Sequence, residues 1–161
     1  MTKTNAARIL DSLGIIKYEL LAYEVDESDL SAKAVADKLN QNLEQVFKTL
    51  VLRGDKTGIF VCIIPGAEEL DLKKAANISG NKNAAMVHMK EVLPLTGYVR
   101  GGCSPIGMKK NYPAYYDDSC ILYDFILVGA GVRGLQLKLA PADLIKVASC
   151  QKGDLLLLKM L

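Results

Sequence analysis

The chain has a single histidine, His88, and no tryptophan, and only 6% of its residues are aromatic. A histidine-based zinc site or a Ser-His-Asp triad would have to use His88, so neither kind of site is expected. The four cysteines are widely spaced and form no C-x-x-C pair, which argues against a metal clamp or a redox couple. We therefore expect neither a metal nor a cofactor.

An excess of charge of one sign is also lacking, because 20 lysines and arginines face 18 acidic residues and leave a net charge of +2. This balance excludes a strongly basic nucleic-acid coat protein, although it leaves room for a local basic patch. No apolar run is long enough to span a bilayer, and the first residues lack the apolar core of a secretory signal. We expect a cytoplasmic protein that binds neither DNA nor a membrane.

Half of the 161 residues are hydrophobic and 24% are charged, which is typical of one globular domain, here residues 1–161. Short strands and short helices, many joined by hairpins, predict a mixed α/β fold. We expect a largely antiparallel sheet or barrel with short helices around it. Strands are predicted at residues 18–25, 48–52, 59–64, 84–87, 112–116, 122–128, 135–139 and 155–158, and helices before Gly14 and at residues 32–39, 43–47, 72–78, 89–93 and 142–148.

Several of these helices carry start and stop signals. Ser31 and Asp71 are predicted N-caps, and Thr4 or Asn5 can cap the first helix. Pro141 suits the first position of the last helix, whereas Pro94 is expected to break the helix at residues 89–93.

Residues 129–134 satisfy the pattern G-x-G-x-x-G of a dinucleotide-binding loop. That motif requires a helix to begin inside it, with its N-terminus facing the pyrophosphate. The residues that follow alternate as Leu-Gln-Leu-Lys-Leu, which is the period of a strand. The pattern therefore predicts a glycine-rich hairpin turn, on which Arg133 could contact a phosphate or a carboxylate.

Two segments could carry chemistry. Lys48 stands among apolar neighbours at a helix-to-strand junction, where partial desolvation would make it a stronger partner for an ester or a carboxylate. The segment 97–107 contains paired glycines, Gly101 and Gly102, whose N–H groups could hold the oxyanion of an acyl-transfer reaction. Ser104 lies in this loop without a G-x-S-x-G elbow, so we interpret it as a hydrogen-bonding group of the loop or of a ligand.

Taken together, these segments resemble the YbaK/EbsC family of aminoacyl-tRNA deacylases, which is related to the editing domain inserted in bacterial prolyl-tRNA synthetase. The resemblance covers residues from about 8 to 148 and rests on an ordered set of motifs. They are FKTLV at residues 47–51, LKKAA at 72–76, TGY at 96–98, GGCSPIGMKK at 101–110, RGLQL at 133–137 and APADL at 140–144.

The resemblance implies a mixed α/β barrel and hydrolysis of mischarged Cys-tRNA(Pro), in which the thiol of the substrate attacks its own carbonyl. It also implies a transient complex with prolyl-tRNA synthetase, which would deliver the tRNA. Lys48 falls on the essential lysine of the family and is expected to orient the substrate. The expected substrate-binding residues are Tyr23, Phe47, Thr49, Gly101, Gly102, Ser104, Pro105, Gly131 and Arg133.

The chain departs from the family pattern at two positions of the later turn. Gly129 stands where many relatives have serine, and Gln136 stands where relatives have an acid, so the polar contacts of this turn do not carry over directly. Surface lysines could supply local charge for an acceptor stem, namely Lys73, Lys74, Lys109 and Lys110.

Two alternatives from other classes stay open. One is a non-catalytic tRNA-binding or regulatory module of the same fold. The other is a hydrolase with Cys103 as the nucleophile and His88 as its base.

Overall fold

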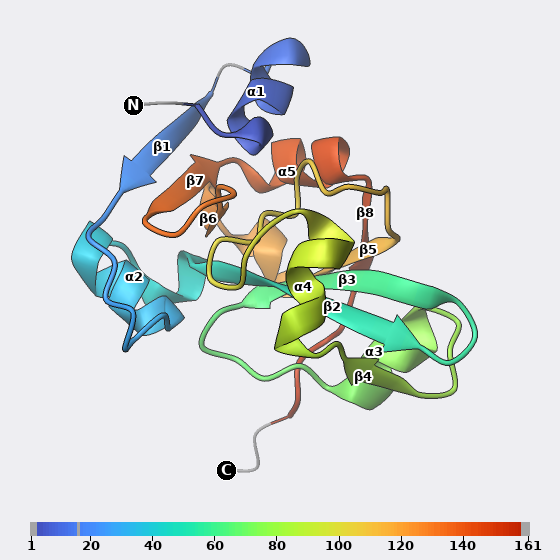
Figure 1. Cartoon of the computed structure of the whole chain (residues 1–161). Helices are drawn as coiled ribbons and strands as arrows, with labels where there is room; N and C mark the ends of the chain where they lie inside the picture. Colours follow the sequence, from blue (N-terminus) through green and yellow to red (C-terminus); the bar gives the residue numbers. More distant parts are fainter. Residues whose placement is uncertain (1–2, 16, 159–161) are drawn as a thin grey trace.

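The computed structural model describes residues 3–15 and 17–158, which form two β-sheets with helices around them (Figure 1). The smaller sheet has the strand order β1 (Tyr18–Ala22), β7 (Leu135–Leu139), β6 (Ile126–Gly129), and both of its pairings are antiparallel. The strands β6 and β7 are joined by the glycine-rich turn and not by a helix. The prediction of a hairpin in place of a dinucleotide-binding loop is confirmed.

The larger sheet has the strand order β4 (Ala84–Met86), β2 (Phe47–Gly54), β3 (Gly58–Pro65), β5 (Ala114–Asp117), β8 (Cys150–Gly153). The pairings β2–β3 and β2–β4 are antiparallel, whereas β3–β5 and β5–β8 are parallel. A parallel bridge from Val46 to Leu127 links this sheet to the smaller one. The expected mixed and largely antiparallel α/β fold is confirmed.

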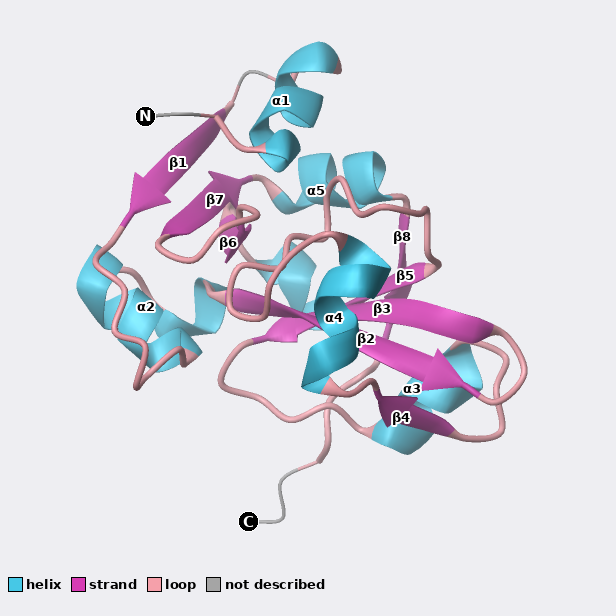
Figure 2. Ribbon diagram, in the orientation of Figure 1, coloured by secondary structure: helices cyan, strands magenta, loops and turns pink. Residues whose placement is uncertain are grey.

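The helices begin where the sequence predicts them. Thr4 caps α1 (Asn5–Ser12), Ser31 caps α2 (Ala32–Leu39) and Asp71 caps α3 (Leu72–Ile78), each with its side-chain oxygen on an N–H of the first turn. Pro141 is the first residue of α5 (Pro141–Ala148). The helix α4 (Met89–Thr96) lies in front of the larger sheet in Figure 2, and α3 lies behind it.

The two faces of the larger sheet bury different hydrophobic clusters. Phe47, Val61 and Ile63 pack with side chains of the smaller sheet, including Val128 and Leu137. Residues of alternate positions, such as Leu52 and Phe60, pack against α3 on the opposite face. Because side chains of successive strand residues point to opposite faces, the β2–β3 hairpin separates these two clusters. The start of β2 lies beside the smaller sheet, next to the bridge from Val46 to Leu127.

Some predicted boundaries are wrong. The strand expected at 18–25 ends at Ala22, and the strand expected at 122–128 is β6 preceded by a 3₁₀ helix (Asp118–Leu122). Pro94 does not break α4, since the helix continues to Thr96, whose hydroxyl donates to the Val92 carbonyl at 2.7 Å. The segment expected to form a 43–47 helix is a 3₁₀ turn at Leu43–Gln45.

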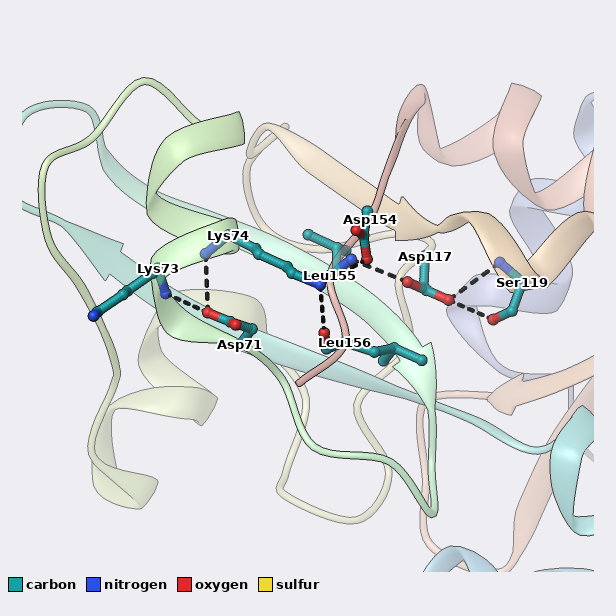
Figure 3. Close-up of polar contacts among 8 residues, drawn as sticks. All are labelled: Asp71, Lys73, Lys74, Asp117, Ser119, Asp154, Leu155 and Leu156. Carbon is teal, nitrogen blue, oxygen red and sulfur yellow. Dashed lines mark hydrogen bonds and ion pairs between the residues drawn. The ribbon is translucent and has the colours of Figure 1, made fainter. Parts of the chain in front are cut away.

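The residues 155–158 do not form the predicted closing strand, and β8 takes that place at the edge of the sheet. The buried carboxylate of Asp117 accepts hydrogen bonds from the N–H of Leu155 (3.1 Å) and from Ser119 (Figure 3). The Lys74 ammonium donates to Asp154 (3.1 Å) and to the Leu156 carbonyl (2.8 Å). Side-chain contacts to α3 and β5 therefore hold this segment together with backbone hydrogen bonds to Glu69 and Asp71, and Leu156 pairs in an isolated bridge with Leu70.

Candidate functional site

A pocket of about 340 Å³ opens between the two sheets at the start of β2. We call it the Lys48 pocket. Segments far apart in the sequence form its wall: the N-terminal end of α2, the start of β2, strands β6 and β7, and the loop at residues 97–107, which we call the glycine loop. Its lining residues are Leu30, Ser31, Ala32, Val35, Val46, Phe47, Lys48, Thr49, Gly66, Gly101, Cys103, Gly129 and Gln136.

Four of the predicted site residues, Phe47, Lys48, Thr49 and Gly101, meet in this pocket. Lys48 is half-buried and is not ion-paired with any described residue. Burial lowers the pKa of its ammonium, and the more distant charges of Glu69 and Glu68 partly oppose that shift. An unpaired, partly desolvated cation of this kind can hold an ester oxygen or a phosphate.

Two buried polar atoms in the pocket have no hydrogen-bond partner among the described residues. They are the hydroxyl Oγ1 of Thr49 and the amide oxygen Oε1 of Gln136. Only 6% of Gln136 is exposed. Buried polar atoms in native proteins are nearly always hydrogen-bonded, so these two are candidates to gain a partner from a bound ligand or a water molecule.

Gly101 and Gly102 play different parts in the loop. Gly101 is exposed at the rim of the Lys48 pocket with φ +85°, a conformation that favours glycine. Gly102 is buried, and its N–H donates to the Val99 carbonyl at 3.0 Å. A Cβ at Gly102 would stand 2.8 Å from the Val132 carbonyl carbon. In this structure the Gly102 N–H is therefore used within the loop, and Gly102 packs the loop against the later turn.

Gly129 has a similar packing role, since a Cβ there would stand 2.3 Å from the Cys103 carbonyl oxygen. A serine at this position would clash with the loop as it is placed here. The absence of a side chain at Gly129 thus allows the end of β6 to approach Cys103 closely.

Four other predicted substrate-binding residues do not line the Lys48 pocket. Ser104 is fully buried, and its hydroxyl accepts the N–H of Ile106 at 3.2 Å. Pro105 faces a separate cavity, and Gly131 lies against the ring of Tyr98. Tyr23 packs beside the cluster of α2 and β6. These four residues lie in the segments around the pocket rather than in its lining, and their contact with substrate stays a prediction.

Arg133 lies just outside the pocket and braces the glycine loop. Its Nε donates to the Arg100 carbonyl at 2.8 Å, and its guanidinium forms an ion pair with Glu27 at 2.7 Å. The Nε would be 3.1 Å from a Cβ at Gly101. The arginine predicted as a ligand for phosphate or carboxylate is thus held by a carboxylate of the chain itself.

Sequence reasoning missed the wall that α2 contributes. The cap Ser31 and the first helical residue Ala32 both line the pocket. This packing depends on Gly66, because a Cβ there would lie 2.2 Å from that of Ala32. The Pro65-Gly66 turn after β3 indicates in the sequence that the chain needs a residue without a side chain there. The local sequence does not show which helix packs against that turn.

The structure does not support a Cys103–His88 pair. Burial raises the pKa of the Cys103 thiol to about 11, so the thiol is protonated near neutral pH. His88 is exposed at the start of α4, where its backbone N–H donates to Glu91 at 3.0 Å.

The described residues contain no cluster of three or more histidine, cysteine or acidic side chains able to hold a metal ion. Within the same part of the chain, no helix is long and apolar enough to cross a membrane. Of the surface lysines, Lys74 is engaged with Asp154 and Leu156, which leaves it less suited to bind an acceptor stem.

Comparisons with known proteins agree with this geometry. Residues 27–147 match the model of the aminoacyl-tRNA editing domain. Enterococcus faecalis EbsC, whose name proposes Cys-tRNA(Pro)/Cys-tRNA(Cys) deacylase activity, is 44% identical over 153 residues, which cover 95% of this chain and 93% of that protein.

More distant similarities point the same way. A proline–tRNA ligase of Burkholderia multivorans is 30% identical, and the match covers 76% of this chain but 23% of that much longer protein. A crystal structure described as a proposed trans-editing enzyme for prolyl-tRNA synthetase superposes with a TM-score of 0.83 at 26% identity, covering 97% of this chain and 99% of the other. The chain belongs to the aminoacyl-tRNA editing domain family.

Proposed function

We propose that this protein is a trans-editing deacylase that releases cysteine from mischarged Cys-tRNA(Pro). The observation that carries the proposal is the Lys48 pocket, whose lining includes a half-buried lysine and two buried polar side-chain atoms, each without a partner among the described residues. The family and the relatives named above support an aminoacyl-tRNA as the ligand.

The residues of the pocket would orient the substrate and stabilise charge rather than attack it. An aminoacyl ester is already activated, so positioning and electrostatic stabilisation suffice for catalysis. In this proposal Lys48 holds the ester oxygen or a nearby phosphate. The unpaired atoms of Thr49 and Gln136 hydrogen-bond polar groups of the aminoacyl end, and the backbone of Gly101 supports the substrate at the rim.

The nucleophile is the thiol of the substrate. Its sulfur forms a bond to the carbonyl carbon, the ester bond to the ribose oxygen breaks, and the thiol proton passes to that oxygen. The products are the free tRNA and a cyclic thioester of cysteine, which water then opens. This route uses no protein nucleophile, in keeping with the protonated state of Cys103.

Delivery of the tRNA by prolyl-tRNA synthetase is part of the proposal. A net charge of +2 provides little non-specific attraction for tRNA, so a transient complex with the synthetase would supply the selectivity. A panel of mischarged tRNAs assayed with and without the synthetase tests this step. Unchanged rates and selectivity would show that delivery is not needed.

The proposed chemistry is tested by comparing Cys-tRNA(Pro) with Ser-tRNA(Pro), which lacks the thiol. Rapid release of cysteine with little release of serine is expected. Equal rates would replace thiol attack by attack of water. If the wild-type protein binds both tRNAs and cleaves neither, it is a non-catalytic binding module.

A further inference from the structure

A second, smaller cavity adjoins the Lys48 pocket on the side of α4. We call it the Met89 pocket; its volume is about 130 Å³. Three residues, Thr49, Gly101 and Cys103, line both cavities. One of them is the exposed Gly101, which has no side chain to obstruct the rim between the two. The two cavities are therefore neighbouring compartments that share these three residues as their common border.

The two compartments differ in chemistry. The Met89 pocket is lined mostly by apolar side chains from β2, from α4 and from the end of β4 with the residue that follows it, namely Leu50, Val51, Met86, Val87, Met89 and Val92. Met86 and Met89 are 46% and 64% exposed at its mouth. Arg100 also lines it, is exposed, and forms no ion pair with any described residue. The compartment thus combines polarizable thioethers with one available cation.

If the Lys48 pocket holds the aminoacyl ester of a ligand, the groups bonded to that ester must lie beside the pocket. In any aminoacyl-tRNA the ester stands on the ribose of the terminal adenosine, so one sugar separates the ester from a flat base and from a phosphate. Methionine thioethers make favourable contacts with aromatic rings, and arginine suits a phosphate. Thr49, whose buried hydroxyl has no partner among the described residues, lines both compartments and therefore lies between the positions proposed for the ester and for the base.

We propose that the Met89 pocket is the subsite for the terminal adenosine of the substrate, with the base against Met86 and Met89 and the 5′-phosphate near Arg100. This inference rests on the proposed function. It adds that the protein recognises the nucleoside itself, which would contribute binding common to all tRNAs. Selectivity among amino acids would then be left to the Lys48 pocket.

A binding experiment tests the subsite without reference to activity. The probe is adenosine 5′-monophosphate, titrated into protein whose methionine methyl groups carry ¹³C, with ribose 5-phosphate as the matched probe that lacks the base. Met108 lines a different cavity and serves as an internal control. We expect the nucleotide to shift the Met86 and Met89 signals and to leave the Met108 signal unchanged. Ribose 5-phosphate should shift neither the Met86 nor the Met89 signal. Signals are assigned with Met86→Ala and Met89→Ala.

The kinetic counterpart uses Met89→Ala with Leu93→Ala as its control, since Leu93 is 50% exposed on the same helix but does not line the pocket. Met89→Ala is expected to lower kcat/KM for Cys-tRNA(Pro) by up to about tenfold, mainly through KM, while Leu93→Ala matches the wild type.

Each failure has its own signature. If the nucleotide moves neither Met86 nor Met89, or if ribose 5-phosphate moves them equally, the nucleoside subsite is wrong even where the protein deacylates Cys-tRNA(Pro). If the wild type leaves Cys-tRNA(Pro) intact while the nucleotide still shifts both methyl signals, the proposed activity fails and the nucleoside site stands.

Discussion

Replacing Thr49 by valine should make the protein more stable and less active. Valine has nearly the same shape as threonine and suits a strand, so the change removes the hydroxyl and little else. That hydroxyl is buried and has no hydrogen-bond partner among the described residues. Leaving a buried polar group unpaired costs about 1–3 kcal/mol, and we expect Thr49→Val to recover about 1 kcal/mol of unfolding free energy.

The assays are chemical denaturation and thermal melting of the free protein. For a chain of this length, 1 kcal/mol corresponds to a rise in Tm of about 2–4 °C. Activity should move the other way. Loss of one neutral hydrogen bond to the substrate, worth about 0.5–1.5 kcal/mol, lowers kcat/KM by roughly two- to tenfold.

Thr96→Val is the matched control. The Thr96 hydroxyl donates to the Val92 carbonyl at 2.7 Å and accepts the N–H of the buried Tyr98 at 3.0 Å. Its removal leaves that N–H unpaired and should destabilise the protein by about 1–3 kcal/mol. The reasoning is refuted if Thr49→Val is no more stable than the wild type, because the hydroxyl would then already have a partner in the free protein.

Four further predictions follow from the site and the fold. Lys48→Ala should lower kcat/KM for Cys-tRNA(Pro) by about 100-fold or more, and a fully active variant would remove the lysine from its proposed role. If the ammonium form of Lys48 is the active one, activity falls as the pH rises through the lowered pKa of this lysine. The charge of Glu69 raises that pKa, so Glu69→Gln should move the alkaline limb of the pH–rate profile to lower pH. Cys103→Ala should keep activity of the same order, whereas near-complete loss would restore the cysteine as a nucleophile. Asp117→Ala should cost about 1–3 kcal/mol by urea denaturation without changing kcat/KM at low temperature, and an unchanged midpoint would mean that the C-terminal segment is held by other contacts.

The parts of the fold that depend on local signals could be predicted from the sequence. The caps Ser31 and Asp71 mark helix starts through their own side-chain hydrogen bonds, and alternation after Gly134 identified a strand where a motif suggested a helix. The predicted break at Pro94 was wrong because the effect of a proline depends on the rest of its turn. Here the Thr96 hydroxyl donates a hydrogen bond to the Val92 carbonyl.

The site could be predicted only in part, for a similar reason. A lysine among apolar residues and a glycine pair made Lys48 and Gly101 candidates, and the resemblance to the YbaK/EbsC family selected them. Whether Gly102 or Ser104 faces a ligand depends on which neighbours take their hydrogen bonds, and these are Val99 and Ile106 within the folded loop. Long-range contacts such as those of Gly66 with α2 leave no comparable trace in the sequence.

The most direct test of the central proposal is single-turnover deacylation of Cys-tRNA(Pro) by the wild-type protein and by Lys48→Ala. The protein should release cysteine much faster than the ester hydrolyses in buffer, and the variant should approach the buffer rate. Release by the wild type at the buffer rate would contradict the account, since the protein would then not catalyse cleavage of this ester.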